Sequence, residues 1–430
     1  MAGLTPLERS VLLLIAVLTA LAGVANYQPW PAVPRFAVAT LALAGLAWVV
    51  SFATEQLGER FGPGVTGMMQ STLGNLPELF VVIFALQKGE LVVAQTAIIG
   101  SVLANALLVL GLVIVVGARR SPDGLMRFSK RLPRDTATLL QVTVFIIVLL
   151  GLSLAAHDPA SHHVKGISIV GAICLLLVYM TWVVPYLRTD RLPGAAEPSA
   201  DGAGGADGLH GADEVHGADQ VQGADQVQGA DQVQGADQVQ GADQVHGVDQ
   251  VQGADQGHGA DRVQGATEVG RGEEPRVPRL SLGLTLALLI VAGTASAFVS
   301  DWFVNGLEPA IGILHISQAF AGLVIVAIAG NAVENTAGLA LAYKRRSDLA
   351  ISVVKNSVAQ IVAFLFPALV LVSFALKTTL TFALAPVYIG ALALTALALW
   401  QVTGDGEAAE FEGWALVSLY VILAALTLYE

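Results

Sequence analysis

The chain has 430 residues, of which 54% are hydrophobic and 13% are charged, and its mean hydropathy is +0.66. This composition excludes an ordinary soluble domain and predicts a membrane protein with many spans. The formal net charge of −12 belongs to one segment, because residues 195–279 hold 16 acidic and 4 basic residues. The single cysteine, Cys174, excludes an intramolecular disulfide and a cysteine metal cluster, and its apolar surroundings predict a core position.

Apolar runs predict an all-α membrane protein with about 11 transmembrane helices, arranged as one, then five, then five. The runs lie at about 9–26, 34–54, 64–87, 90–117, 136–156, 165–188, 280–300, 317–343, 347–376, 379–400 and 412–429. The chain therefore divides into an N-terminal helix at 1–30, a first five-helix repeat at 31–188, a linker at 189–279 and a second five-helix repeat at 280–430.

The first motif lies in the third apolar run, where Gly74-Asn75-Leu76-Pro77-Glu78 places a carboxylate in the middle of a predicted span. A charge at this depth costs several kcal/mol unless it has a partner, so Glu78 is a candidate functional residue. Asn75 and Glu78 are three residues apart and are expected to share a helical face. Pro77 removes a backbone donor and is expected to loosen the helix near Gly74.

The next predicted helix carries Ser101 and Asn105, four residues apart on one face. Their hydroxyl and amide oxygens would extend the set of ligands around Glu78. The alternative that the sequence leaves open is that these side chains only form hydrogen bonds between neighbouring helices.

Basic residues predict the orientation of the chain, because loops rich in Lys and Arg remain in the cytoplasm. The loop from Arg119 to Arg134 carries six basic residues and is therefore placed in the cytoplasm. Counting spans from it places the N-terminus and the linker in the cytoplasm and the C-terminus outside. No organelle signal is found, which favours a bacterial cytoplasmic membrane. The basic cluster flanks a membrane span, so no nucleic-acid partner is expected.

The linker contains ten six-residue units between Gly211 and Gly270, most of them GADQVQ. One valine in six residues buries too little apolar surface to form a core, so disorder is expected. Two alternatives stay open: a β-solenoid of short period, and weak metal binding by His216, His246 and His258 together with the aspartates.

The second half of the chain repeats the first motif as Gly330-Asn331-Ala332-Val333-Glu334, again in the middle of a predicted span. The next helix again carries polar residues, here Ser357 and Gln360. Five spans separate the two motifs, so the two helices cross the membrane in opposite directions. Inverted repeats that meet at a central ion site are typical of secondary transporters.

The ligands offered by the two motifs are carboxylate, amide and hydroxyl oxygens, which suit a hard cation such as calcium. Glu78 and Glu334 are the expected metal ligands, and protons are expected to compete for their oxygens. Lys355 is the nearest cation that could pair with one of these acids.

These motifs resemble the calcium/proton exchanger family within the calcium/cation antiporter superfamily. The resemblance rests on GNLPEL followed by GSVLANALLVLG and on GNAVEN followed by NSVAQIVAF, and it extends over Thr54–Gly111 and Ser300–Pro367. It implies that Glu78 and Glu334 bind the cation and the exchanged protons alternately. It implies that Asn75, Asn331, Ser101, Ser357 and Gln360 support that site, and that the first helix is peripheral.

The sequence departs from the family pattern at three positions near the second motif. Asn335 replaces a common histidine, Asn356 replaces a glycine, and Gln318 stands where an acid is frequent. The expected function is calcium/proton antiport by alternating access, without an enzymatic reaction or a cofactor. The alternatives are antiport of sodium, potassium or manganese with the same fold, and a passive cation channel. The oligomeric state stays open, a homo-oligomer included.

Overall fold

A computed structural model describes residues 4–58, 60, 73–129, 131–189 and 279–430. Residues 1–191 and 277–430 form one compact unit, so the two ends of the sequence build a single helical body. The linker, its hexad repeats and its three histidines lie almost entirely outside the described residues. The first part of the predicted span at 64–87 also lies outside them.

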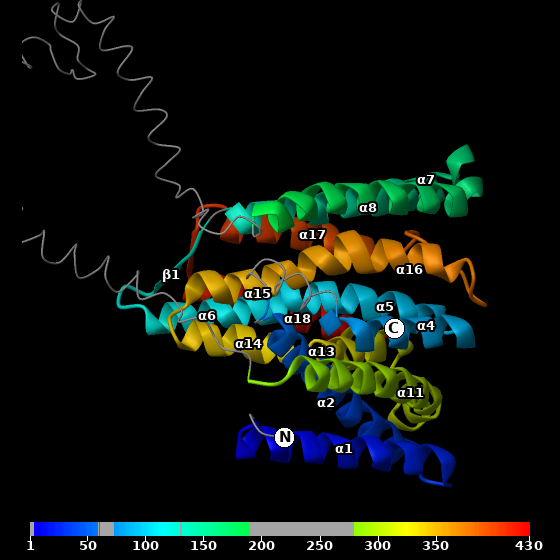
Figure 1. Cartoon of the computed structure of the whole chain (residues 1–430). Helices are drawn as coiled ribbons and strands as arrows, with labels where there is room; N and C mark the ends of the chain where they lie inside the picture. Colours follow the sequence, from blue (N-terminus) through cyan, green and yellow to red (C-terminus); the bar gives the residue numbers. More distant parts are fainter. Residues whose placement is uncertain (1–3, 59, 61–72, 130, 190–278) are drawn as a thin grey trace, which may run out of the picture. The chain divides into compact units, whose positions relative to one another are not determined.

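The described residues of the first half of the chain are mostly helical (Figure 1). Its elements are α1 (Pro6–Tyr27), α2 (Ala32–Gly58), α4 (Leu76–Lys88), α5 (Leu91–Leu103), the π-helix η1 (Ala104–Val109), α6 (Leu110–Arg120), strand β1 (Leu125–Arg127), α7 (Arg131–Ala156), the 3₁₀-helix η2 (Pro159–His163) and α8 (Val164–Thr189). Helices α5, η1 and α6 continue one another, because the backbone stays helical through both junctions.

The second half repeats this pattern with different lengths. Its elements are α11 (Leu282–Leu314), α12 (Gln318–Phe320), the π-helix η4 (Ala321–Val326), α13 (Ala327–Gly330), α14 (Ala332–Tyr343), α15 (Ser347–Gln360), the π-helix η5 (Ile361–Leu365), α16 (Phe366–Ser373), α17 (Pro386–Thr403), strand β2 (Glu407–Ala409) and α18 (Glu410–Leu428). Three π-helical turns therefore interrupt the helices that carry or follow the two motifs, and such turns are frequent at functional sites.

Nine helices in the described residues are long and apolar enough to cross a membrane. The number rises to ten when the bent pair Gln318–Gly330 and Asn335–Tyr343 is counted as one span. The predicted all-α membrane architecture is confirmed. One further span was predicted, at 64–87. The structure describes only its second part, which is α4.

Helices α1, α2 and α11 pack against one another as a group (Figure 1). Glycines allow close contact: the Trp302 ring covers Gly23, and Ile15 covers Gly45. An ion pair of 2.9 Å between Arg279 and Glu8 joins the start of α11 to α1. Only 17% of the apolar stretch of α1 is buried, so most of this helix faces outward.

The helices that follow the two motif turns form the core of the unit, and 89% of the α5–η1–α6 stretch is buried. A Cβ atom on Gly100 would lie 2.6 Å from the backbone of Leu323, and one on Gly322 would lie 2.1 Å from the Thr96 hydroxyl. Glycine is therefore required where α5 crosses η4, because any side chain would separate the two backbones.

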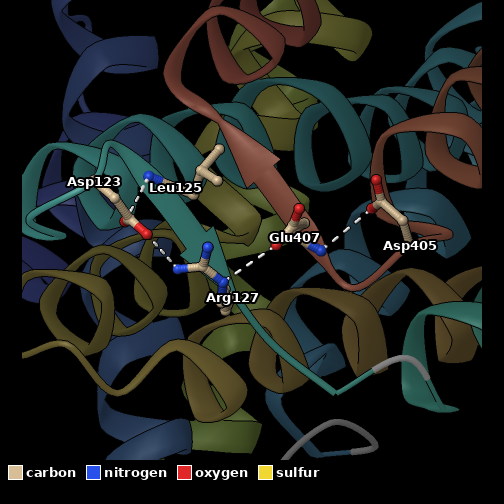
Figure 2. Close-up of polar contacts among 5 residues, drawn as sticks. All are labelled: Asp123, Leu125, Arg127, Asp405 and Glu407. Carbon is tan, nitrogen blue, oxygen red and sulfur yellow. Dashed lines mark hydrogen bonds and ion pairs between the residues drawn. The ribbon is translucent and has the colours of Figure 1, made fainter.

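Two short strands, which the sequence did not predict, join the two repeats at one end of the helices. Strand β1 pairs with β2 in antiparallel register, with Met126 opposite Ala408. Figure 2 shows Arg127 between two carboxylates, 2.6 Å from Asp123 and 3.2 Å from Glu407. We call this end of the helices the strand end, and the end that carries Lys88 the opposite end.

Two expectations from the sequence are wrong in this part of the chain. Cys174 is exposed on α8 rather than buried in the core. Helix α17 begins at Pro386 instead of near 379, because Ser373 accepts a hydrogen bond from the Leu380 amide and holds the preceding segment in a non-helical turn. Proline at the first helical position then starts α17.

Candidate cation site

Both motif helices break at their asparagine. Asn75 has φ −83° and ψ 6°, and Asn331 has φ −99° and ψ 14°, so each ends one helical segment and precedes another. The expectation that Pro77 causes the break explains only one repeat, because the second breaks without a proline. In α4, Pro77 lies in the first turn, where a backbone N–H has no intrahelical partner in any case.

The break places both glutamates in the first turn of a helix. Glu78 is the third residue of α4 and Glu334 is the third residue of α14. Backbone N–H groups and the helix dipole favour negative charge at this position. Glu78 is 1% exposed, so this local field lowers the cost of burying its carboxylate. The side chain of Glu334 lies outside the described part of the chain.

The two motifs lie in contact with each other. A Cβ atom built on Gly330 would be 3.7 Å from the Cβ of Glu78, which is ordinary van der Waals contact. Gly330 therefore leaves the backbone of the second motif against the glutamate of the first. Gly74, the equivalent glycine, is buried in the turn that precedes Asn75.

A chain of hydrogen bonds joins the predicted polar residues across four helical segments. The Asn331 side chain donates to Ser101 Oγ at 2.9 Å, and the Asn105 side chain donates to Asn331 Oδ1 at 2.8 Å. Asn105 also donates to Ser357 Oγ at 3.2 Å. All four side chains are buried, with at most 1% of each exposed. The structure therefore brings these four residues together, through hydrogen bonds between neighbouring helices.

The amide nitrogens of this network face protein acceptors, and two amide oxygens remain for a ligand. Asn331 Nδ2 makes a further bond of 2.9 Å to the Ala327 carbonyl. Asn105 Oδ1 and Gln360 Oε1 are buried, and neither accepts a hydrogen bond from any described residue. Buried oxygens without a donor suit a cation, which needs lone pairs rather than N–H groups.

The π-helical turns explain how these oxygens are aimed. Asn105 is the second residue of η1, and Gln360 is the last residue before η5. A π turn inserts an extra residue into the helix and so rotates the side chains on either side of it. The sequence placed both residues on regular helices and missed this rotation.

Ser300 of α11 is a site residue that motif reasoning missed. It is fully buried, and its hydroxyl donates to the Pro77 carbonyl at 3.3 Å. Ser296, one turn earlier on α11, is also fully buried. In the sequence, Ser300 had marked only where the resemblance begins in the second half of the chain.

Lys355, the cation that the sequence offered as a partner for one of the acids, contacts a hydroxyl in the part of the chain that the structure describes. Its ammonium is fully buried and donates to Thr403 Oγ1 at 3.1 Å, at the C-terminal end of α17. No carboxylate among the described residues forms an ion pair with it. The carbonyl end of a helix carries partial negative charge, which favours a cation there.

Acidic and amide groups also meet at the opposite end of the core. Gln318 donates to Glu90 Oε2 at 2.7 Å, joining the start of α12 to the start of α5. Burial and the nearby Glu308 carboxylate raise the pKa of Glu90, and the Gln318 hydrogen bond partly offsets this. The family pattern often has an acid at the position of Gln318. Here the acid is the neighbouring Glu90 instead.

Among the residues that the structure describes, no group of three or more His, Cys, Asp or Glu side chains could hold a metal ion. The donors that do converge are amides, hydroxyls and one described carboxylate. This set fits a weakly held oxygen-ligated cation better than a permanently bound transition metal.

Residues 32–186 and 284–429 match the family described as "Sodium/calcium exchanger protein", which is more than half of the chain. The chain belongs to this family. The predicted assignment to the calcium/proton exchanger branch of the calcium/cation antiporters is confirmed. The protein is therefore an integral membrane transporter.

Two curated relatives match nearly the whole chain. The vacuolar calcium ion transporter of Schizosaccharomyces pombe is 25% identical over 410 residues, which cover 94% of this chain and 82% of the relative. The Ca(2+)/H(+) antiporter ChaA of Bacillus subtilis is 24% identical over 418 residues, which cover 97% of this chain and 98% of the relative.

Solved structures share the fold. The structure of native YfkE superimposes with a TM-score of 0.67 at 21% identity, covering 98% of this chain and all of that one. The H+/Ca2+ exchanger CAX superimposes with a TM-score of 0.64 at 15% identity, covering 99% of this chain and 93% of that one.

Proposed function

We propose that this protein exchanges calcium for protons across a membrane, with Glu78 and Glu334 as the shared cation and proton sites. Support comes from the names of relatives in bacteria and in a fungus that match more than nine-tenths of the chain. Further support comes from the contact of Glu78 with Gly330 and from the buried amide and hydroxyl groups that bond to the neighbouring Asn331.

The observation that carries the proposal is the burial of Glu78 against Gly330, in the first turn of α4. Two ionised carboxylates in a water-poor site repel each other and lose their hydration. One divalent cation or added protons would remove this penalty. Cation and protons therefore compete for the same oxygens, and this competition couples the two fluxes.

The amide network gives the site its preference for a cation over water alone. Asn105 and Asn331 direct their N–H groups into the protein, so their orientation is fixed before the cation arrives. Asn105 Oδ1 and Gln360 Oε1 supply neutral oxygens in addition to the carboxylates. Neutral oxygens tune affinity without adding charge, as a site that must release its cargo requires.

Alternating access follows from the inverted repeats. The site lies where the α4 and α13–α14 turns meet, so a shift of the α2–α11 group against the core would change the side from which ions reach it. Contact between this group and the core at the site includes the Ser300 hydrogen bond to Pro77. Protons moving down their gradient would then drive calcium the other way.

The proposed membrane is a bacterial cytoplasmic membrane, with the strand end in the cytoplasm. Arg119, Arg120 and Arg127 lie at that end, and Arg345 lines the same surface pocket as Arg127. The N-terminus and the linker would then lie inside and the C-terminus outside.

The test is calcium uptake into vesicles reconstituted with the full chain under an imposed pH gradient. Uptake should require the gradient and should fall at least 100-fold in Glu78→Gln, because the amide supplies neither the negative charge that balances calcium nor a group that takes up a proton. Glu412→Gln is the matched control, since its side chain only caps α18 and accepts from the Ala409 amide at 2.8 Å.

Two results would contradict the proposal. In the first, sodium, potassium or manganese dissipates the pH gradient and calcium does not. The same fold would then carry a different cation. Calcium flux that continues unchanged without any proton movement would indicate a channel.

A further inference from the structure

A groove of about 730 Å³ runs between α1, α2 and α11. Its lining on α1 extends from Leu12 to Gln28, which is about 24 Å at the rise of an α-helix. Most of its wall is apolar, with alanines at 16, 20, 292 and 295 that leave the space open. A groove of this length exceeds the ~15 Å depth of one leaflet's hydrocarbon region.

One end of the groove is polar and aromatic. Tyr27 and Gln28 line it from the end of α1, and Trp302 lines it from α11. The Tyr27 and Trp302 rings meet edge to face, with their centroids 6.1 Å apart. Tyrosine and tryptophan are typical of the depth at which a membrane's hydrocarbon meets its headgroups. The groove is thus apolar along its length and polar at one end, as an amphiphilic ligand would require.

A cationic side chain reaches α11 about one turn beyond that polar end. Arg35 is in the first turn of α2, which follows α1 directly, and it donates to the Asn305 carbonyl at 3.4 Å. Asn305 follows Trp302 by less than one turn of α11. A guanidinium has five N–H donors. Among the described residues, the acceptor found for Arg35 is the Asn305 carbonyl. Its Nε is buried without a hydrogen-bond partner there.

We propose that this groove is a binding site for one phospholipid, with an acyl chain along α1 and the phosphate on Arg35. The outer face of α1 carries exposed leucines and valines, including Leu13 and Val17, so the groove opens into the bilayer. Phosphate complements the guanidinium in charge and in geometry. The lipid would fill the space between α1 and the α2–α11 pair, whose walls otherwise lack partner atoms.

The inference is independent of which ions the central site carries. Its position is also separate from that site, because the main contacts of α1 among the described residues are with α2 and α11. The lipid would come from the leaflet on the Tyr27 side, which is the opposite end from the strands.

Native mass spectrometry of the full chain, purified in mild detergent, tests the apolar part. The wild type should retain one phospholipid per chain. Ala16→Phe and Ala20→Phe fill the groove with a ring and should each reduce the lipid-bound fraction about tenfold. Val17→Phe, on the outward face of the same helix, should retain lipid like the wild type.

The headgroup contact is tested by adding back lipid after detergent exchange. Arg35→Gln should weaken retention of phosphatidylglycerol about tenfold and leave retention of a diacylglycerol, which has no phosphate, unchanged. Lys165→Gln is the control, because Lys165 is an exposed cation at the same end of the helices. Equal retention in Arg35→Gln and the wild type would overturn the assignment of the phosphate.

Three other outcomes would overturn the site itself. The first is that the groove-filling variants retain as much phospholipid as the wild type. The second is that the purified wild type carries only detergent in the groove. A dimer that Ala20→Phe dissociates would show that a second copy of this chain, not a lipid, covers α1.

Discussion

The two repeats are alike at the motif residues and at the serines that follow them, and they differ at many other positions. Glu334 follows Glu78 at an interval of 256 residues, and Ser357 follows Ser101 at the same interval. These pairs lie at the candidate cation site, where Ser101 and Ser357 each accept one amide hydrogen from the asparagine network. The shared residues are those that a central cation would contact from both sides.

Away from the site, the same interval pairs unlike residues. Lys355 corresponds to Ile99, and both are buried, so one repeat places a charge where the other places a hydrocarbon. Gly89 corresponds to Arg345, and both have left-handed backbone, with φ of 95° and 59°. The backbone turn is thus repeated although the residue is not.

This difference between shared central residues and unlike peripheral residues suits a transporter that moves ions in one direction. The glutamates, asparagines and serines at the centre are supplied by both repeats, so that either conformation can hold the cargo. The ends face different compartments, so their charges need not match: Glu90 in the first repeat corresponds to Arg346 in the second. The predictions below test how far this division between centre and periphery holds.

The largest effect is expected from the paired glutamates. Glu78→Gln and Glu334→Gln should each abolish calcium/proton exchange, with at least a 100-fold loss of flux, because each removes one negative charge and one proton site. Flux in reconstituted vesicles measures both variants side by side. Full activity in either one would break the equivalence of the two repeats.

A smaller loss is expected from the centre of the amide network. Asn331→Ala removes the acceptor of Asn105 and the donor to Ser101, at about 1–3 kcal/mol for each buried group left unsatisfied. Calcium affinity should fall about 10- to 100-fold, as measured by isothermal titration. Asn305→Ala, at an exposed position beyond the core, should bind calcium normally. Unchanged affinity in Asn331→Ala would exclude the network from the site.

The close crossing of α5 and η4 predicts an effect on stability. Gly100→Ala places a methyl group 2.6 Å from the Leu323 backbone and should destabilise the protein by about 1–3 kcal/mol. Gly166→Ala is the control, because a Cβ there meets open space. Thermal unfolding in detergent compares the two variants. Equal midpoints would mean that α5 and η4 can move apart without loss of stability.

The unlike pair Ile99 and Lys355 predicts opposite outcomes. Lys355→Met removes a buried charge that has only Thr403 as described partner, and should leave stability unchanged or raise it by about 1 kcal/mol. Ile99→Lys should lower the free energy of unfolding, because it places a new charge at a buried, mostly apolar position. The melting temperatures of both variants are compared with that of the wild type. A large destabilisation by Lys355→Met would show that the ammonium stabilises the fold.

The smallest effect is expected at the opposite end, where the pKa of Glu90 is raised by burial and by Glu308. The folded state then holds its proton more tightly than the unfolded state does. This stabilisation is complete below the ordinary value of 4.5 and is lost as pH rises through the raised pKa. Glu90→Gln should remove a few tenths of a kcal/mol of this pH dependence in thermal unfolding. Glu308→Gln should reduce it, and identical profiles would disprove the coupling.

Much of the site could be predicted because its residues are polar in apolar surroundings. Glu78, Asn105 and Ser357 contrast with the helices that carry them, and that contrast needs no knowledge of the fold. Ser300 escaped notice because a serine in a long helix is common. Its role depends on the Pro77 carbonyl, 223 residues away in the sequence.

The sequence by itself determined the membrane class, most of the helices and the duplicated motif, because hydrophobic length and residue spacing are local properties. The tertiary structure decided where the helices break, which amide oxygens remain for a cation, and how β1 joins β2. These features depend on contacts between segments that lie far apart in the chain. Such contacts form only when the two halves pack together, so no local pattern could have specified them.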